Sequence, residues 1–218
     1  MRKAIITCGG WDGHEPALTT AIAKRLLEEE GFDAAIYTDL DIYTDEKAMS
    51  EASLIVPCWT GGNITGEQSQ GLLKTIASGV GVAGWHGGMC DAFRADTNYQ
   101  YMTGGQWVAH PGGIIKYTVN ITSDDPIVRG IEDFEVESEQ YYMHTDPSNE
   151  VLAYTTFQGQ YDPWVKGCVM PVIWKRMWDK GRVFYMSLGH TANVFDIPAV
   201  PEILRRGMLW AAREEGAR

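Results

Sequence analysis

The segment from Val80 to Gly88 constrains the fold of this chain more than any other. It reads Val-Gly-Val-Ala-Gly-Trp-His-Gly-Gly, an apolar run typical of a buried strand that ends among glycines. The frame Gly84-x-His86-x-Gly88 has the spacing of a nucleophile elbow, a sharp strand-to-helix turn that holds one side chain over a sheet edge. We therefore expect His86 at the apex of such a turn and Cys90 in the following helix. The plainer alternative is a tight turn whose glycines serve packing alone.

Strand and helix patterns alternate through the first half of the chain. Strand-like runs cover residues 3–8, 34–38, 54–58 and 80–85, and helical patterns follow Pro16 and the capping-box sequence Thr65-x-x-Gln68. This order predicts an α/β fold, a parallel sheet with helices on both faces.

The second half of the chain has a different pattern. Strand-like runs at 117–121, 135–142, 151–156, 172–178 and 182–188 follow one another closely, before a last helix at about 201–213. They predict antiparallel or edge strands added to the sheet. Because the sequence contains no linker or internal repeat, we expect a single domain over residues 1–218.

Composition excludes several classes of partner. The net charge is −11 and no run of Lys or Arg occurs, so a nucleic-acid partner is not expected. No apolar stretch approaches the roughly 20 residues that cross a bilayer, and the first residues lack a signal-peptide pattern. Four widely spaced cysteines suit reduced thiols. We expect a cytoplasmic protein without a membrane partner; a homo-oligomer stays open.

The five histidines carry the main functional signal. His14, His86 and His190 each follow a predicted strand, and the carboxyl ends of parallel strands share one edge where ligands bind. His110 and His144 lie in loop-like sequence whose location stays open. Imidazole transfers protons near neutral pH and binds metals. We therefore expect a shared site at this edge, although a lone histidine is more often a core or surface residue.

Carboxylates and tryptophans accompany the histidines. Acidic residues close to them in sequence are Asp12, Glu15, Asp91, Asp146 and Asp196. Carboxylates can orient imidazoles or join a metal site, but they are also common in the loops of an acidic chain. Tryptophans beside the expected site are Trp11, Trp59, Trp85 and Trp107. Their flat faces suit the C–H face of a sugar, and core packing explains them equally well.

Three separated motifs, in order, resemble the ThuA-like trehalose-utilisation family. They are Gly-Trp-His-Gly-Gly-Met-Cys-Asp-Ala-Phe-Arg at 84–94, Gly-Gly-Gln-Trp-Val-Ala-His-Pro at 104–111 and Arg-Val-Phe-Tyr-Met-Ser-Leu-Gly-His at 182–190. The resemblance covers nearly the whole chain and implies the class I glutamine amidotransferase-like fold, a flavodoxin-like, mostly parallel sheet. In amidotransferases the elbow carries a cysteine, and a late histidine is followed two residues later by glutamate. Here His86, His190 and Ala192 stand at those positions, so a glutaminase is not expected.

The resemblance also implies carbohydrate metabolism. The family is associated with disaccharide catabolism alongside oxidoreductases that make 3-keto sugars, which points to a disaccharide or a 3-keto-disaccharide as substrate. A carbonyl at C3 acidifies the C2 proton, so a histidine base could start isomerisation or β-elimination, and hydrolysis is a further route. The predicted catalytic residues are His86, His190, His144 and Asp146. The predicted substrate contacts are Trp11, His14, Glu15, Trp59, Asn63, Trp85, Asp91, Arg94, Trp107 and His110.

Two other classes of function stay open. One is a metal-dependent hydrolase, with zinc or another divalent metal held by some of His14, His86, His144 and His190 together with a carboxylate. No ligand spacing such as His-x-x-x-His supports it. The other is a non-catalytic sugar-binding or regulatory module that kept the fold and lost the amidotransferase triad.

Overall fold

A parallel sheet forms the centre of the protein, as the strand–helix alternation predicts. The computed structural model describes residues 1–214, and within them nine strands form one sheet in the order β2-β1-β3-β4-β11-β10-β9-β6-β7. The parallel part comprises β2 (Asp33–Tyr37), β1 (Lys3–Gly10), β3 (Leu54–Thr60), β4 (Gly81–Trp85) and β11 (Gly181–Met186). The order β2-β1-β3-β4-β11 is that of flavodoxin-like folds. The predicted fold class is confirmed.

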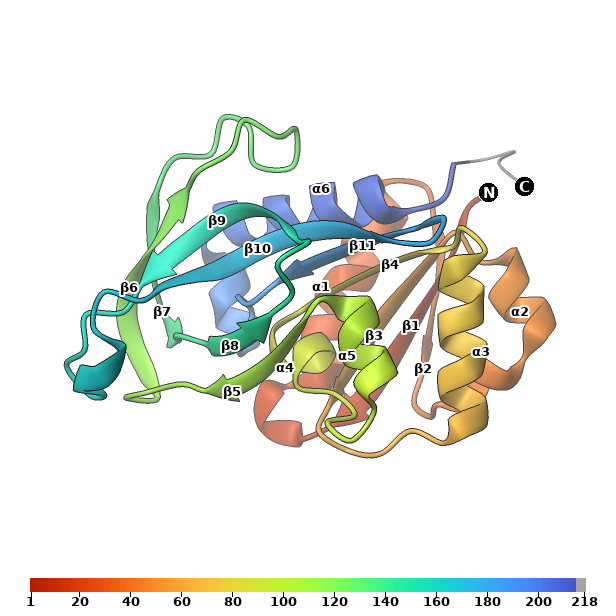
Figure 1. Ribbon diagram of the computed structural model, residues 1–218. Helices are drawn as coiled ribbons and strands as arrows, with labels where there is room; N and C mark the ends of the chain where they lie inside the picture. Colours follow the sequence, from red (N-terminus) through yellow and green to blue (C-terminus); the bar gives the residue numbers. More distant parts are fainter. Residues whose placement is uncertain (215–218) are drawn as a thin grey trace.

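An antiparallel extension continues the sheet beyond β11. It comprises β10 (Val169–Trp178), β9 (Glu150–Thr156), β6 (Ile114–Ile121) and β7 (Phe134–Glu139). A separate pair, β5 (Gly105–Ala109) and β8 (Tyr142–Thr145), lies with it at the end of the molecule where the parallel strands finish (Figure 1). The predicted strand at 135–142 is thus divided between β7 and β8. The strand β5 was not predicted, and His144 belongs to β8 rather than to a loop.

Helices cover both faces of the parallel part, as predicted. The long helices α1 (Pro16–Glu29) and α6 (Ala199–Ala211) pack on one face. On the other lie α2 (Glu46–Glu51), α3 (Gly66–Ala77), α4 (His86–Cys90) and α5 (Thr97–Thr103). Short 3-10 turns are η1 (Asp12–His14), η2 (Asp41–Thr44), η3 (Pro163–Val165) and η4 (Ala192–Asp196). Among residues 1–214, no helix is long and apolar enough to cross a bilayer.

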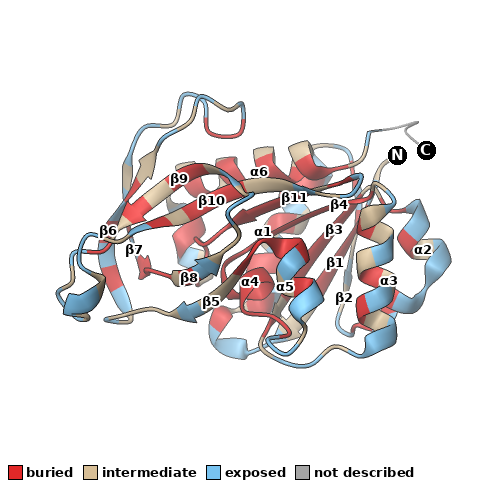
Figure 2. Cartoon of the chain, viewed as in Figure 1, coloured by how far each residue is buried: buried red, intermediate tan, exposed pale blue. Residues whose placement is uncertain are grey.

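Successive side chains of each strand point to opposite faces of the sheet, and this divides the core into two layers. In β1, Ile5 faces α3 while Ala4 and Ile6 face α1, and in β4 Val82 and Ala83 point to opposite faces. The central strands are buried on both sides, whereas the outer faces of the helices are exposed (Figure 2). This rigid double layer fixes the carboxyl ends of β1, β4 and β11, from which the histidines project.

The predicted capping box at the start of α3 is confirmed and yields a stability prediction. The Gln68 backbone N–H donates to Thr65 Oγ1 at 3.2 Å, and the Thr65 N–H donates to Gln68 Oε1 at 3.0 Å. Replacing Thr65 by alanine removes the first bond and leaves a helix N–H without its acceptor. We expect Thr65→Ala to lower the unfolding free energy by about 1 kcal/mol in urea denaturation, and Thr65→Ser to keep most of it. Equal stability of the two variants would contradict this role for the hydroxyl.

Candidate functional site

His86 occupies the elbow between β4 and α4. Its φ of +45° lies in the left-handed region, and Cys90 lies in the helix that follows, both as the glycine frame predicts. The glycines around it permit close packing. A Cβ atom at Gly88 would lie 3.1 Å from the Cα of Cys58, and one at Gly87 would lie 2.5 Å from Cε1 of His14. The elbow therefore brings His86 to the sheet edge and also leaves room for the His14 ring.

Two other histidines reach the same edge from neighbouring strands. His14 ends η1, directly after β1, and His190 follows β11. The loop that carries His190 is held in place by Glu15, whose carboxylate accepts a hydrogen bond from the Ala192 backbone N–H at 2.9 Å. Because β1, β4 and β11 are parallel, their carboxyl ends deliver these side chains to one place.

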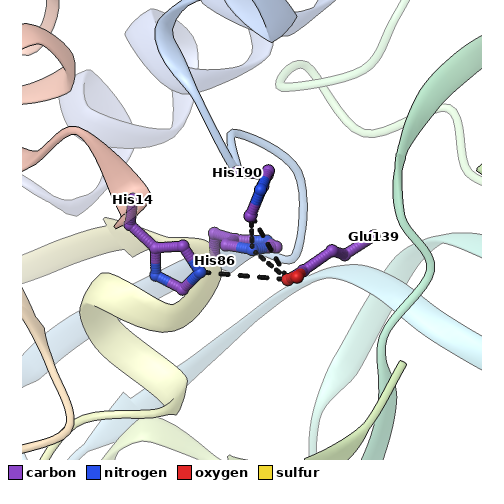
Figure 3. Close-up of side chains that lie close together, drawn as sticks. All are labelled: His14, His86, Glu139 and His190. Atoms are coloured by element: carbon purple, nitrogen blue, oxygen red, sulfur yellow. Dashed lines mark hydrogen bonds and ion pairs between the residues drawn. The ribbon is translucent and has the colours of Figure 1, made fainter. Parts of the chain in front are cut away.

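Glu139, the last residue of β7, completes what we call the histidine–glutamate cluster: His14, His86, Glu139 and His190 (Figure 3). Glu139 Oε2 lies 3.1 Å from His86 Nε2, 3.3 Å from His190 Nδ1 and 3.8 Å from His14 Nε2. His190 Nδ1 is also 3.3 Å from His86 Nε2. Each of the four residues is at least nine-tenths buried. Three imidazoles thus converge on one carboxylate away from bulk water.

Burial and neighbours fix the charge states in this cluster. Burial lowers the pKa of His86 from 6.5 to about 4, against the opposing influence of Glu139, so its ring is neutral at pH 7. Burial alone would raise the pKa of Glu139. Contacts with His14, His190 and His86 outweigh it and hold the pKa of this carboxyl well below its usual range. A carboxylate that stays ionised at such low pH is a poor proton acceptor, so Glu139 serves as a fixed negative charge.

Hydrogen bonds to the outer ring nitrogens orient two of the imidazoles. His86 Nδ1 lies 2.8 Å from the Ser187 carbonyl oxygen. Because a carbonyl oxygen can only accept, Nδ1 carries the proton, and the lone pair of the neutral ring is on Nε2, toward Glu139. Tyr141 stacks on the same ring at 4.0 Å between centroids. His14 Nδ1 is similarly paired with Thr60 Oγ1 at 2.7 Å, which leaves its Nε2 facing the cluster.

A pocket of about 300 Å³ opens above the cluster. Its lining includes Trp11, His14, Thr60, Asp91, Arg94, Trp107, His110, Glu139 and Tyr141. Arg94 pairs with the buried Asp91 through two hydrogen bonds and lies over the Trp107 ring, 4.7 Å from its centroid. These contacts give the pocket aromatic walls and an Arg94–Asp91 ion pair at its lining.

His110 is the most accessible imidazole beside the cluster. Its Nε2 lies 3.6 Å from Glu139 Oε1, and its side chain is 35% exposed. Among the described residues, its Nδ1 has no hydrogen-bond partner. The ring stacks at a tilt on Trp107, with the centroids 5.6 Å apart. The unpartnered Nδ1 is itself buried, so the ring nitrogen of His110 that lies beside the Glu139 carboxylate and the pocket is Nε2.

The structure does not bring His144 and Asp146 to this site. His144 is exposed on β8, where its neighbour Met143 takes the buried position of the alternating strand. Asp146 accepts hydrogen bonds from Ser148 and pairs with Arg176 at 3.3 Å, so its carboxylate holds a turn together.

Trp85, Trp59 and Asn63 also lie outside the pocket. Trp85 is buried on the opposite face of the sheet, edge-to-face with Phe195. Trp59 packs over Gly9, where a Cβ would meet its ring. Asn63 lines a separate cavity. Of the predicted substrate contacts, the pocket thus brings together Trp11, His14, Asp91, Arg94, Trp107 and His110, while Glu15 acts on the His190 loop.

Sequence reasoning missed Glu139 and Tyr141. In β7, Glu135 and Glu137 are exposed, and the alternation predicts the same for Glu139. Instead β7 ends at Glu139, which is buried. The alternation of polar and apolar residues stops at Gln140-Tyr141, which marks the end of the strand in the sequence. The sequence does not show, however, that this end of β7 contacts the elbow at His86.

Comparisons with known proteins agree with the fold. A family model described as ThuA, trehalose utilisation, matches residues 3–211. A ThuA-like protein from Bacteroides uniformis superposes with a TM-score of 0.80 at 19% identity over 96% of this chain and 91% of the other. A ThuA-like protein from Parabacteroides merdae gives 0.78 at 18% identity, over 96% and 89%. A β-galactosidase from Bacillus circulans gives 0.57 at 12% identity, over 96% of this chain and 30% of the enzyme. No curated protein sequence matches.

Proposed function

Since the chain belongs to the ThuA, trehalose utilisation, family, we propose that it is a carbohydrate-processing enzyme. It acts on a disaccharide or its 3-keto derivative by proton transfer in the pocket above the histidine–glutamate cluster. One observation carries this proposal: three imidazoles and a carboxylate, contributed by four separate segments, converge at the base of a pocket with aromatic walls. A structural turn does not require such a convergence of buried polar groups, which is costly unless every group is paired.

The walls of the pocket suit a sugar ring. Trp11 and Trp107 offer flat apolar surfaces for the C–H face of a pyranose, and Arg94 with Asp91 offers a donor and an acceptor for hydroxyl or carbonyl groups. A volume of about 300 Å³ lies at the lower end for small-molecule sites, which suits one ring inside and a second ring at the mouth.

The reaction that fits these groups is β-elimination from a 3-keto glycoside. His110 accepts the C2 proton, and the C–H electron pair forms an enolate whose oxygen needs a positive partner, a role that Arg94 can fill. The enolate then expels the oxygen at C1, and a double bond forms between C1 and C2. The departing sugar oxygen takes the proton back from the His110 imidazolium. The products are an unsaturated 3-keto sugar and a free sugar, with no oxidant consumed.

His86 and His190, the acid–base pair expected from sequence, have a different place in this scheme. His86 is 1% exposed and His190 8%, and neither lines the pocket, whereas Glu139 does. We assign to His86 and His190 the role of keeping the Glu139 carboxylate ionised, while His110 transfers the C2 proton.

Turnover of defined sugars tests the proposal. Trehalose, other disaccharides and their 3-keto derivatives would be incubated with the purified protein, with products followed by mass spectrometry and NMR. We expect the 3-keto substrates to release a free sugar and an unsaturated ketone. Saturable sugar binding without turnover would favour the non-catalytic sugar-binding module, and absence of both would overturn the assignment to carbohydrates.

A second expected result concerns glutamine. The elbow carries His86 in place of a thiol, Ala192 stands where the triad needs an acid, and burial raises the pKa of the Cys90 thiol. No activated thiolate is available, so we expect no ammonia release from glutamine above background. A coupled glutamate dehydrogenase assay measures this. Ammonia release that vanished in Cys90→Ala would contradict it.

A further inference from the structure

We propose that the histidine–glutamate cluster binds one divalent transition-metal ion, with His14 Nε2, His86 Nε2, His190 Nδ1 and Glu139 Oε2 as its ligands. This deepens the proposed function, since the ion would hold Glu139 and the three imidazoles in place at the base of the pocket. The four ligand atoms come from separate elements and lie within 4.8 Å of one another. The site therefore has no His-x-x-x-His spacing in the sequence.

The hydrogen bond of His86 is the first argument. Its Nδ1–H donates to the Ser187 carbonyl, so the lone pair of the neutral ring is on Nε2. That lone pair lies 3.1 Å from a carboxylate oxygen and 3.3 Å from His190 Nδ1. A lone pair against an anionic oxygen is repulsive unless a proton or a cation lies between them. A metal ion at the centre would satisfy both nitrogens and the carboxylate at once.

The outer hydrogen bonds are the second argument. Metal-bound histidines characteristically donate their other ring N–H to a backbone carbonyl or another oxygen, which fixes the tautomer and the ring orientation. His86 does so to Ser187, and His14 Nδ1 lies 2.7 Å from Thr60 Oγ1, a hydroxyl oxygen that is able to accept such a bond. Both inner nitrogens are thereby directed at the cluster before any ion arrives.

The distances between ligand atoms are the third argument. Metal–ligand bonds of about 2.0–2.1 Å imply separations of about 3.3–3.4 Å between adjacent ligands of a tetrahedral site. The separations among His86, His190 and Glu139 are 3.1, 3.3 and 3.3 Å. His14 lies farther out: its Nε2 is 3.8 Å from Glu139 Oε2, and the four ligand atoms span up to 4.8 Å, so its ring would have to move inward to complete the set. Imidazole-rich sites suit Zn²⁺ and its transition-metal neighbours rather than Mg²⁺ or Ca²⁺.

A competing arrangement contains no metal. A proton on His190 could be shared between Glu139 and His86 Nε2, which would give a charged hydrogen-bond network in place of a coordination sphere. The two arrangements differ in metal content, in the spectrum of a cobalt-substituted protein and in the effect of chelators.

Metal content decides between them. The full chain would be purified without a histidine tag and analysed by inductively coupled plasma mass spectrometry, then stripped with a chelator and titrated with Zn²⁺ and Co²⁺. We expect roughly one ion per chain, saturable rebinding, and visible absorption bands from the Co²⁺ form. Glu139→Gln and His86→Asn should weaken Zn²⁺ binding at least about tenfold, while His144→Ala, a matched histidine outside the cluster, should bind as the wild type does.

The outcomes separate this proposal from the proposed function because no sugar enters the measurement. A wild-type chain that is purified without metal and shows no saturable binding of Zn²⁺ or Co²⁺ overturns the metal site. Full binding by Glu139→Gln and His86→Asn would also overturn it by placing the ion elsewhere. Should a variant fail to fold, the stoichiometry and the Co²⁺ spectrum of the wild type still decide. Metal binding without sugar turnover would leave the site standing and reject the reaction.

Discussion

Replacing His110 by alanine is expected to lower turnover of a 3-keto disaccharide by about 10²–10⁴-fold, the usual contribution of a positioned general base. His110 lines the pocket, its Nδ1 is buried without a partner, and its Nε2 lies 3.6 Å from Glu139 Oε1. The carboxylate can therefore stabilise the imidazolium that forms when the ring takes a proton. Steady-state kinetics of the purified variant measures the effect, which should fall on kcat more than on KM.

His144→Ala is the matched control for this measurement. His144 is an exposed histidine of the same antiparallel region, on β8, and touches neither the pocket nor the cluster. It should keep wild-type kinetics. Turnover of His110→Ala within a few-fold of the wild type would remove His110 as the proton carrier, and circular dichroism of both variants would show whether their folds are intact.

Local rules account for the part of the site that could be predicted from sequence. A glycine frame around a histidine after a buried strand is a short-range pattern, and His86 occupies the predicted turn with φ +45°. The meeting of His14, His86 and His190 follows from topology, because parallel strands deliver their carboxyl ends to one edge. Neither inference needs knowledge of distant contacts.

The rest of the site depends on contacts that local patterns do not encode. Glu139 reaches His86 across a sequence separation of 53 residues, from a strand whose earlier glutamates face water. Conversely, the short spacing between His144 and Asp146 suggested an assisting pair, yet the alternation of β8 and the turn after it direct the two side chains elsewhere. Long-range pairing of the antiparallel strands decides both cases.

The parallel and antiparallel parts of the structure contribute different parts of the site. The parallel part holds three histidines at the carboxyl ends of β1, β4 and β11. The antiparallel extension supplies Glu139 from β7, and the β5–β8 pair with its flanking residues supplies Trp107, His110 and Tyr141. The elbow thus presents His86 among buried imidazoles and a carboxylate, an arrangement that contains no thiol.

The charge states in the cluster link its protonation to stability. In the folded protein His86 is held neutral by burial, with a pKa of about 4 against the ordinary 6.5, while Glu139, His14 and His190 face its ring. Between about pH 4 and pH 6.5, His86 binds a proton in the unfolded chain but not in the folded chain. Stability therefore rises with pH across this interval and is lost as the pH falls through it. The lowered pKa of Glu139 acts in the same direction below about pH 4.5, because the unfolded carboxylate protonates first.

In chelator-treated protein, we therefore expect the unfolding free energy to fall by on the order of 3 kcal/mol between pH 6.5 and pH 4 through His86. Urea denaturation at several pH values measures the slope. His86→Asn removes the titrating ring and should show a shallower slope over this interval, whereas His144→Asn, which removes an exposed histidine, should keep the wild-type slope. A His86→Asn protein with an unchanged slope would mean that His86 takes up its proton as readily in the folded chain as in the unfolded one. In that case the neutral, lone-pair-bearing Nε2, on which the geometry of the cluster depends, would not exist at pH 5.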